Sequence, residues 1–169
     1  TATTIAVSTN NTLMKSGVKG FVDTYNALMK AISAETKVTM NADGTPTAGA
    51  LTGDSSMRTL VTSIRNELNA MSGTGTLKSL AQFGISTDSK TGLLTLDDKK
   101  WDKAITTNSA DISSVFNGKS GLLARLSTAT DGYARASTGT LAERTKSLSE
   151  SLNDLKKQQD SLDERMTLL

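Results

Sequence analysis

The residue types that could do chemistry are limited by two absences. The 169-residue sequence contains no histidine and no cysteine. This excludes histidine-based acid–base catalysis, Ser-His-Asp and Cys-His nucleophiles, zinc sites built from these residues, and disulfides. Serine and lysine could still form a dyad, but no nucleophile-elbow motif presents a serine. We therefore expect no enzymatic activity.

Two short segments resemble ligand-binding loops but lack essential positions. Gly118-Lys119-Ser120 resembles the end of a phosphate-binding loop, yet Ser113 stands where the first glycine is needed. The segment from Asp88 to Asp98 resembles a calcium loop, yet Lys90 occupies its third ligand position and position twelve is not Glu. We interpret the first as a helix-to-helix turn and the second as a plain hairpin.

Glycine pairs and paired carboxylates also have structural interpretations. Gly73-Thr74-Gly75 is half of a dinucleotide fingerprint, but Lys78 stands where the third glycine belongs. Asp97-Asp98 and Asp163-Glu164 are adjacent residues, which do not share a helix face. Asp97 and Asp98 fit a helix N-terminus, where negative charge is favoured. We assign no catalytic, cofactor-binding or metal-binding residue and expect no cofactor.

The overall composition excludes further classes of partner. The chain has 19 basic and 17 acidic residues, a net charge of +2, which does not indicate binding to nucleic acid or to a membrane surface. No apolar run reaches the roughly 18 residues of a membrane span. No signal peptide opens the chain, and because its first residues resemble the end of a strand, we expect a fragment of a longer protein.

The apolar spacing predicts a mainly α protein: a helical bundle with a long C-terminal coiled-coil-type helix, a small β-hairpin and an N-terminal strand at Thr4–Ser8. In the first helix, the predicted apolar stripe consists of Val18, Phe21, Val22, Tyr25, Leu28, Met29 and Ile32. The predicted helices cover about 13–35, 54–71, 77–83, 110–116, 122–133 and 140–169, and one more begins near 98. The other predicted elements are a loop at 37–53, a hairpin at 84–97 and a turn or kink at 137–140.

The last helix carries the most regular pattern. Leucines recur every seven residues from Leu141 to Leu169, and the alternate seam positions include Leu152 and Met166. The polar residues Thr145 and Gln159 interrupt this seam. Two interpretations stay open: the helix packs on its own domain, where we favour the helix from Leu13, or it forms a coiled-coil arm with another segment or subunit. The predicted interface consists of Leu141, Leu148, Leu152, Leu155, Leu162 and Met166.

Four segments, in matching order, carry a resemblance to a known family. Phe21–Leu28 is FVDTYNAL, similar to the family's FVDAYNAL helix, and Leu51–Arg58 is LTGDSSMR, similar to its L-x-GD-S-x-x-R pattern. Gly84–Asp97 contains GISTD and TGLLTLD, similar to its hairpin, and Gly139–Thr145 is GTLAERT, similar to the entry of its terminal helix. From about Ile5 to Leu169, the sequence thus resembles the bacterial flagellar filament cap proteins, the flagellar hook-associated protein 2 family.

The resemblance implies a structural assembly protein without catalytic residues. Members form a ring-like homo-oligomer at the distal tip of the filament and promote insertion of exported flagellin. They are secreted by the flagellar export route. The implied partners are further copies, flagellin, hook-associated junction proteins and an export chaperone. Residues 1–12 would end a β head domain, and residues 13–169 would form a helical leg domain with its hairpin at 84–97 and its heptad helix at 140–169.

Two other functions remain as alternatives. The chain could be another flagellar axial subunit, such as a hook-filament junction protein or a flagellin, because these also combine helical bundles with terminal coiled coils. The hairpin from Gly84 to Asp97 argues against that alternative. A tip-exposed adhesin has weaker support, from surface Ser and Thr residues and a mild positive charge.

Overall fold

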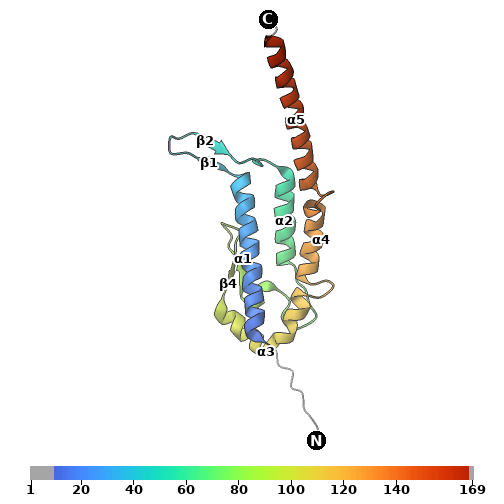
Figure 1. The fold of residues 1–169 in the computed structure, drawn as a ribbon. Coiled ribbons are helices and arrows are strands. Elements are labelled where there is room, and N and C mark those ends of the chain that lie inside the picture. The colour runs from blue at the N-terminus through green and yellow to red at the C-terminus, as the bar shows by residue number, and fades with distance from the viewer. Residues whose placement is uncertain (1–9, 168–169) are drawn as a thin grey trace. The chain divides into compact units, whose positions relative to one another are not determined.

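The computed structural model describes residues 10–167, which divide into two compact units between Leu126 and Ser127. The described residues form five α-helices, one short 3-10 helix and two antiparallel two-stranded sheets (Figure 1). The mainly α prediction is therefore confirmed. The strand predicted at Thr4–Ser8 lies outside the described residues. None of the helices in 10–167 is both long and apolar enough to cross a membrane.

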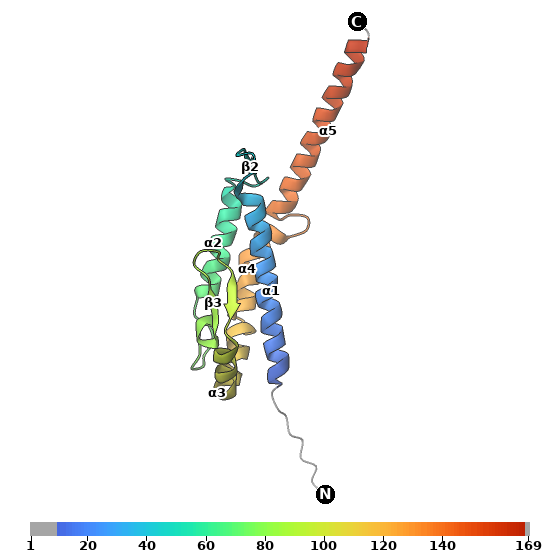
Figure 2. The same ribbon diagram turned by 90° about the vertical axis from the view of Figure 1, so that its left-hand side faces the viewer.

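Helices α1 (Asn11–Thr36) and α2 (Ser55–Asn69) lie side by side in both views (Figures 1 and 2). Each begins at a side-chain cap. Asn10 Oδ1 accepts the N–H of Leu13 at 2.9 Å, and Asp54 Oδ1 accepts the N–H groups of Ser56 and Met57 at 2.8 and 3.0 Å. These bonds satisfy donors that a helix start leaves unpaired, which is why both helices begin where they do.

The buried face of α1 is narrower than its predicted apolar stripe. Phe21 and Ile32 are half-buried and Leu28 is 43% exposed, so the apolar spacing extends beyond the residues that are buried. The steps of four, three and four residues between the buried positions follow one helix face, and Leu28 lies beyond the edge of that face. The buried residues of α1 are Val18, Val22, Tyr25 and Met29; those of α2 are Met57, Leu60, Ile64 and Leu68.

The segment predicted as a loop at 37–53 contains a second hairpin. Strand β1 (Val38–Met40) pairs with β2 (Pro46–Ala48), with Val38 opposite Ala48 and Met40 opposite Pro46. Gly44, at φ +81°, closes the turn between them. The strands were missed because they have three residues each and neither is buried, so only the turn residues were visible in the sequence.

The predicted hairpin at 84–97 is present. The 3-10 helix η1 (Leu80–Phe83) precedes β3 (Ile85–Thr87), which pairs antiparallel with β4 (Leu94–Leu96). Helix α3 (Asp98–Phe116) follows, and its side chain Trp101 is fully buried beside Phe83, with ring centroids 6.1 Å apart. The two helices predicted here form one, bent at Asn108, whose φ of −133° is not helical.

Helix α4 (Leu122–Ala134) crosses the division between the units, and α5 (Thr140–Thr167) belongs to the second unit. Residues 135–139 form the turn between them, where Gly139 N–H donates to Arg135 C=O at 3.0 Å. Thr140 Oγ1 also donates to Gly132 C=O at 3.3 Å. None of the described residues of α5 is buried.

Candidate functional site

The residues considered for chemistry have structural partners. Gly118-Lys119-Ser120 lies in the turn between α3 and α4, as predicted, and Gly121 N–H donates to Gly118 C=O at 2.7 Å. Asp88 Oδ1 accepts the backbone N–H groups of Lys90 and Thr91 at 3.0 and 2.7 Å, so its carboxylate organises the β3–β4 turn. No cluster of acidic residues within 10–167 is arranged to hold a metal ion.

The half-fingerprint loop at Gly73–Gly75 packs against α3. The carboxylate of Asp111 accepts the N–H of Leu77 at 2.9 Å and lies so close to Gly75 that a side chain there would collide with it. Ser72 is buried and its hydroxyl donates to Val115 C=O at 3.1 Å. This loop is therefore a packing element of the first unit, with its backbone held by α3.

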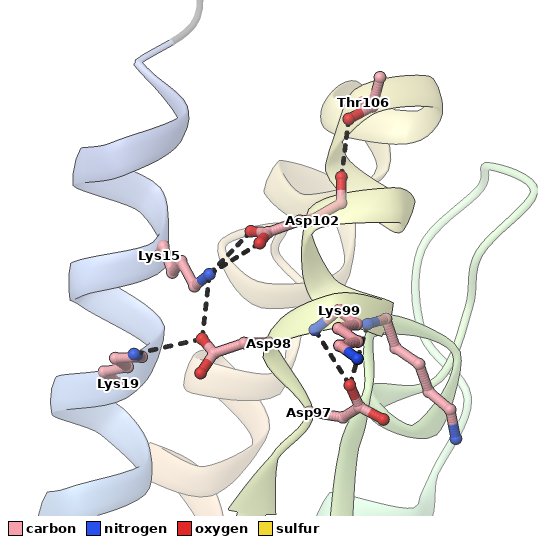
Figure 3. A network of polar contacts seen from close by, with 8 residues as sticks. Lys15, Lys19, Asp97, Asp98, Lys99, Asp102 and Thr106 are labelled. Atoms are coloured by element: carbon pink, nitrogen blue, oxygen red, sulfur yellow. Dashed lines mark hydrogen bonds and ion pairs between the residues drawn. The ribbon is translucent and has the colours of Figure 1, made fainter.

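Asp97 and Asp98 have different roles although they are adjacent (Figure 3). Asp97 Oδ1 caps α3 by accepting the N–H groups of Lys99 and Lys100, each at 3.0 Å. Asp98 points toward α1, where its carboxylate contacts Lys15 Nζ at 3.0 Å and Lys19 Nζ at 3.2 Å. The prediction that both acids serve the start of this helix is confirmed for Asp97, while Asp98 also joins α3 to α1.

Lys15 is the centre of this α1–α3 contact. Its Nζ also donates to both carboxylate oxygens of Asp102, at 2.8 and 3.0 Å. Hydrogen bonds to Asp102 and Asp98 raise the pKa of Lys15, and hydrogen bonds from Lys15 and Lys19 lower the pKa of Asp98. Because the carboxylates are more than half exposed, this network orients two helices without contributing strongly to stability.

Two segments that carry the family resemblance contact each other through Asn26, which was not predicted as a contact residue, and through Tyr25, which was predicted only as part of the apolar stripe. Asn26 Nδ2 donates to Leu94 C=O at 2.9 Å, and Asn26 Oδ1 accepts the N–H of Leu94 at 2.7 Å. The amide of Asn26 thereby pairs with β4 as another strand would. The Tyr25 hydroxyl donates to Gly92 C=O at 2.9 Å from a buried position.

Gly92 is required where this hairpin meets α1 and α2. Its φ is +71°, and a side chain here would collide with the guanidinium of Arg65. Burial raises the pKa of Tyr25, and the nearby Arg65 partly offsets that rise. In the sequence, Tyr25-Asn26 and Thr91-Gly92 each belong to a segment that carries the family resemblance. Their spacing along the chain gave no indication that these segments are in contact.

The predicted heptad face lies on α5, which is about 42 Å long at 1.5 Å per residue. The six predicted interface residues are between 40% and 67% exposed, so none of them is buried. The exposed ion pairs of this helix are long: Lys146–Glu150 is 4.0 Å and Lys157–Asp154 is 3.7 Å. The predicted interface residues on this face are Leu141, Leu148, Leu152, Leu155, Leu162 and Met166.

A second apolar surface belongs to the first unit. It is a groove of about 540 Å³ lined by α1, α3 and the beginning of α4. Phe21 and Phe116 meet edge to face across it, with centroids 6.1 Å apart and planes at 84°. Leu123 lines the groove and is 45% exposed. Exposed apolar surface of this kind is typical of protein–protein contact.

The described residues thus carry two exposed apolar surfaces, which are typical of proteins that bind other proteins. Residues 1–169 match the family described as flagellar hook-associated protein 2 C-terminus. The chain belongs to this family. The B-type flagellar hook-associated protein 2 of Pseudomonas aeruginosa is 40% identical over 167 residues, which are 98% of this chain and 35% of the relative.

Two further relatives support the family assignment. The flagellar hook-associated protein 2 of Escherichia coli K12 is 30% identical over 159 residues, which are 90% of this chain and 34% of the relative. The crystal structure of the Escherichia coli flagellar cap protein FliD, domains D1-D2-D3, is similar with a TM-score of 0.69 and 28% identity, over 83% of this chain and 37% of that chain. The chain thus spans about a third of these relatives.

Proposed function

We propose that this chain is the C-terminal part of a flagellar filament cap protein, a structural assembly component without enzymatic activity. The observation that carries the proposal is the match of residues 1–169 to the hook-associated protein 2 C-terminal family, together with the likeness to a flagellar cap protein structure. In this role the full protein caps the distal filament tip as a homo-oligomer and promotes insertion of exported flagellin.

The exposed heptad face of α5 supports an assembly role. A helix whose leucines stay exposed in the single chain has an apolar seam available for a partner helix. Thr145 and Gln159 interrupt the seam and favour one register over others, at a cost in affinity. The packing of this helix along α1, favoured from the sequence, stays a prediction, as does pairing with another segment or subunit.

The remaining partners and the location follow from the same proposal. A cap at the filament tip is secreted, contacts flagellin, and meets hook-associated junction proteins and an export chaperone before assembly. The similar solved structure, described as a flagellar cap protein, favours the cap over a junction protein or a flagellin. An adhesive role at the tip has no support in the described residues beyond exposed Ser and Thr.

The test uses a bacterium in which the gene that contains this chain carries Leu155→Glu and Leu162→Glu. These changes place charges in the apolar seam, and we expect flagellin monomer in the medium, short or absent filaments and loss of swimming. The matched control carries Asn153→Glu and Ser161→Glu, which add the same charge to the outer side of α5. Normal filaments in the Leu variant, at normal protein abundance, would contradict the role of this face.

Deletion of the gene tests the cap proposal separately from the heptad face. Loss of filaments, with flagellin released as monomer, is the expected result. Localisation of a tagged protein at filament tips rather than along the shaft separates the cap from other axial subunits. Normal filaments in the deletion strain would overturn the proposed function.

A further inference from the structure

The β1–β2 hairpin has two chemically different faces, and both are exposed. Register places Val38 opposite Ala48 and Met40 opposite Pro46, so these four apolar side chains share one face. The alternate residues Thr39 and Thr47 share the other face. Val38 is 52% exposed and Met40 is 68% exposed. The hairpin thus presents an apolar face for which the first unit provides no cover.

The hairpin is well organised despite this exposure. Asn41 Nδ2 donates to Thr45 Oγ1 and to Thr47 Oγ1, each at 2.9 Å, which stiffens the polar face. At the tip, Asp43 Oδ1 accepts the N–H and the hydroxyl of Thr45 at 2.9 and 2.6 Å. A two-stranded hairpin is only marginally stable alone in water, and these side-chain bonds help to hold its shape.

The base of the hairpin fixes its direction. Gly49 N–H donates to Lys37 C=O at 3.0 Å, and Leu51 N–H donates to Glu35 C=O at 2.8 Å, so both strands are tied to the end of α1. The carbonyl of Glu35 lies so close to Gly49 that a side chain there would collide with it. The hairpin projects sideways from the ends of α1 and α2 (Figure 1).

The same unit carries a groove with complementary chemistry. This groove, of about 450 Å³, lies between α1, α2 and the β3–β4 turn. Its apolar wall includes Ile32 and Val61, which are half-buried. Three cations, Arg58, Arg65 and Lys90, line the same groove, whereas the hairpin tip carries the carboxylate of Asp43. The hairpin and the groove thus carry opposite charges, and each also has an apolar surface.

We propose that the β1–β2 hairpin of one chain docks into the α1–α2 groove of a second copy, with Met40 against the apolar wall and Asp43 among Arg58, Arg65 and Lys90. The contact is head-to-tail, because the two surfaces differ. Repetition of such a contact gives a ring where the rotation closes, or an open filament where it does not. The proposal goes beyond the cap function, which does not require this particular contact between copies.

The absence of cysteine allows a direct test by disulfide crosslinking. Two variants of the chain, Met40→Cys and Thr62→Cys, carry tags of different size and are mixed under oxidising conditions. Thr62 is exposed and lines the groove. The matched control replaces Met40→Cys by Thr39→Cys, one residue away on the polar face. We expect about tenfold more mixed dimer with Met40→Cys, because a disulfide forms only between closely facing positions.

A second comparison tests the charge complementarity. Asp43→Asn keeps the oxygen that accepts from Thr45 but removes the charge. In the Met40→Cys background, we expect it to lower the mixed-dimer yield about threefold at low salt, and the difference to vanish at high salt. Equal yields for Met40→Cys and Thr39→Cys, a prevailing product between two Met40→Cys chains, or no effect of Asp43→Asn would each overturn the proposal.

Discussion

The first unit and helix α5 use the same kind of apolar spacing with opposite results. In the first unit, apolar residues spaced three and four apart on α1, α2 and α3 are buried in a core that also includes Phe83. Trp101 and Val115 of α3 belong to this core. In α5, a more regular pattern leaves every described leucine exposed. A clean periodicity therefore shows that a helix has an apolar face and says nothing about where the partner of that face comes from.

The polar contacts differ in the same way. Asn26 of the first unit makes two hydrogen bonds to a strand 68 residues away in sequence, and Arg125 Nε donates to Glu67 Oε2 at 2.7 Å across 58 residues. On the surface of α5, the ion pairs Lys146–Glu150 and Lys157–Asp154 each join residues within about one helical turn. The first unit is thus joined by bonds between residues far apart in sequence, whereas these exposed pairs on α5 are local and are weakened by salt.

The largest effect is expected from the core of the first unit. Trp101→Ala removes a fully buried ring that packs on Phe83, and should lower the free energy of unfolding by about 3–5 kcal/mol. Leu155→Ala on α5 should change it by less than about 0.5 kcal/mol. Chemical denaturation followed by circular dichroism measures both. A comparable loss for the two variants would remove the distinction between the regions.

Trp101→Phe separates the contribution of the indole N–H group from that of ring packing in the same measurement. The Trp101 Nε1–H group is buried and has no hydrogen-bond acceptor among residues 10–167. Leaving a buried donor unpaired costs about 1–3 kcal/mol, so its removal offsets part of the lost packing. We expect Trp101→Phe to cost well under half of the loss seen with Trp101→Ala. Equal losses would show that the indole N–H has an acceptor in solution.

A smaller effect is expected where the hairpin joins α1. Asn26→Ala removes both bonds to Leu94 and leaves its N–H and C=O without their partner, at a cost of about 2 kcal/mol. Hydrogen exchange at the Leu94 amide should accelerate at the same time. Asn66→Ala on the exposed side of α2 is the control and should stay within about 0.5 kcal/mol. Unchanged exchange in Asn26→Ala would contradict the role given to this side chain.

Local signals predicted most elements of the first unit, while long-range contacts were invisible. Asp54 and Asp97 cap the starts of α2 and α3, and Gly92 lies in the β3–β4 turn. Such signals depend on a few neighbouring residues, so the predicted boundaries of these elements lie close to the observed ones. The β1–β2 hairpin was missed because its strands are short and exposed. The bond between Asn26 and Leu94 needs the tertiary fold before it exists. The interface on α5 was predicted from periodicity alone, and both the interface and its partner stay predictions.

The α1–α3 ion-pair network predicts a modest pH dependence confined to the first unit. Hydrogen bonds from Lys15 and Lys19 lower the pKa of Asp98 below its ordinary 3.8. A lowered folded-state pKa stabilises the protein above the unfolded-state value, and this contribution is lost as the pH falls through the folded-state value. The free energy of unfolding should therefore fall below about pH 4, and fall less in Asp98→Asn.

Asp23→Asn is the matched control for this titration, since Asp23 is exposed on the same unit. High salt should reduce the difference between Asp98→Asn and the unmodified chain, because exposed ion pairs are screened. Identical acid profiles for Asp98→Asn and the unmodified chain would show that the network does not contribute in solution.

The smallest effect on stability, and the clearest separation of the two regions, is expected from Leu155→Glu with Leu162→Glu. The single tryptophan, Trp101, lies in the first unit, so its fluorescence reports the unfolding of that unit. Its transition should move by less than about 0.5 kcal/mol in this variant, because neither leucine is buried. Concentration-dependent association measured by light scattering should decrease at the same time, since a charged seam opposes helix pairing. A shift of the fluorescence transition comparable to that of a core substitution would mean that the heptad face is covered by its own chain, and the seam would then belong to the fold instead of to assembly.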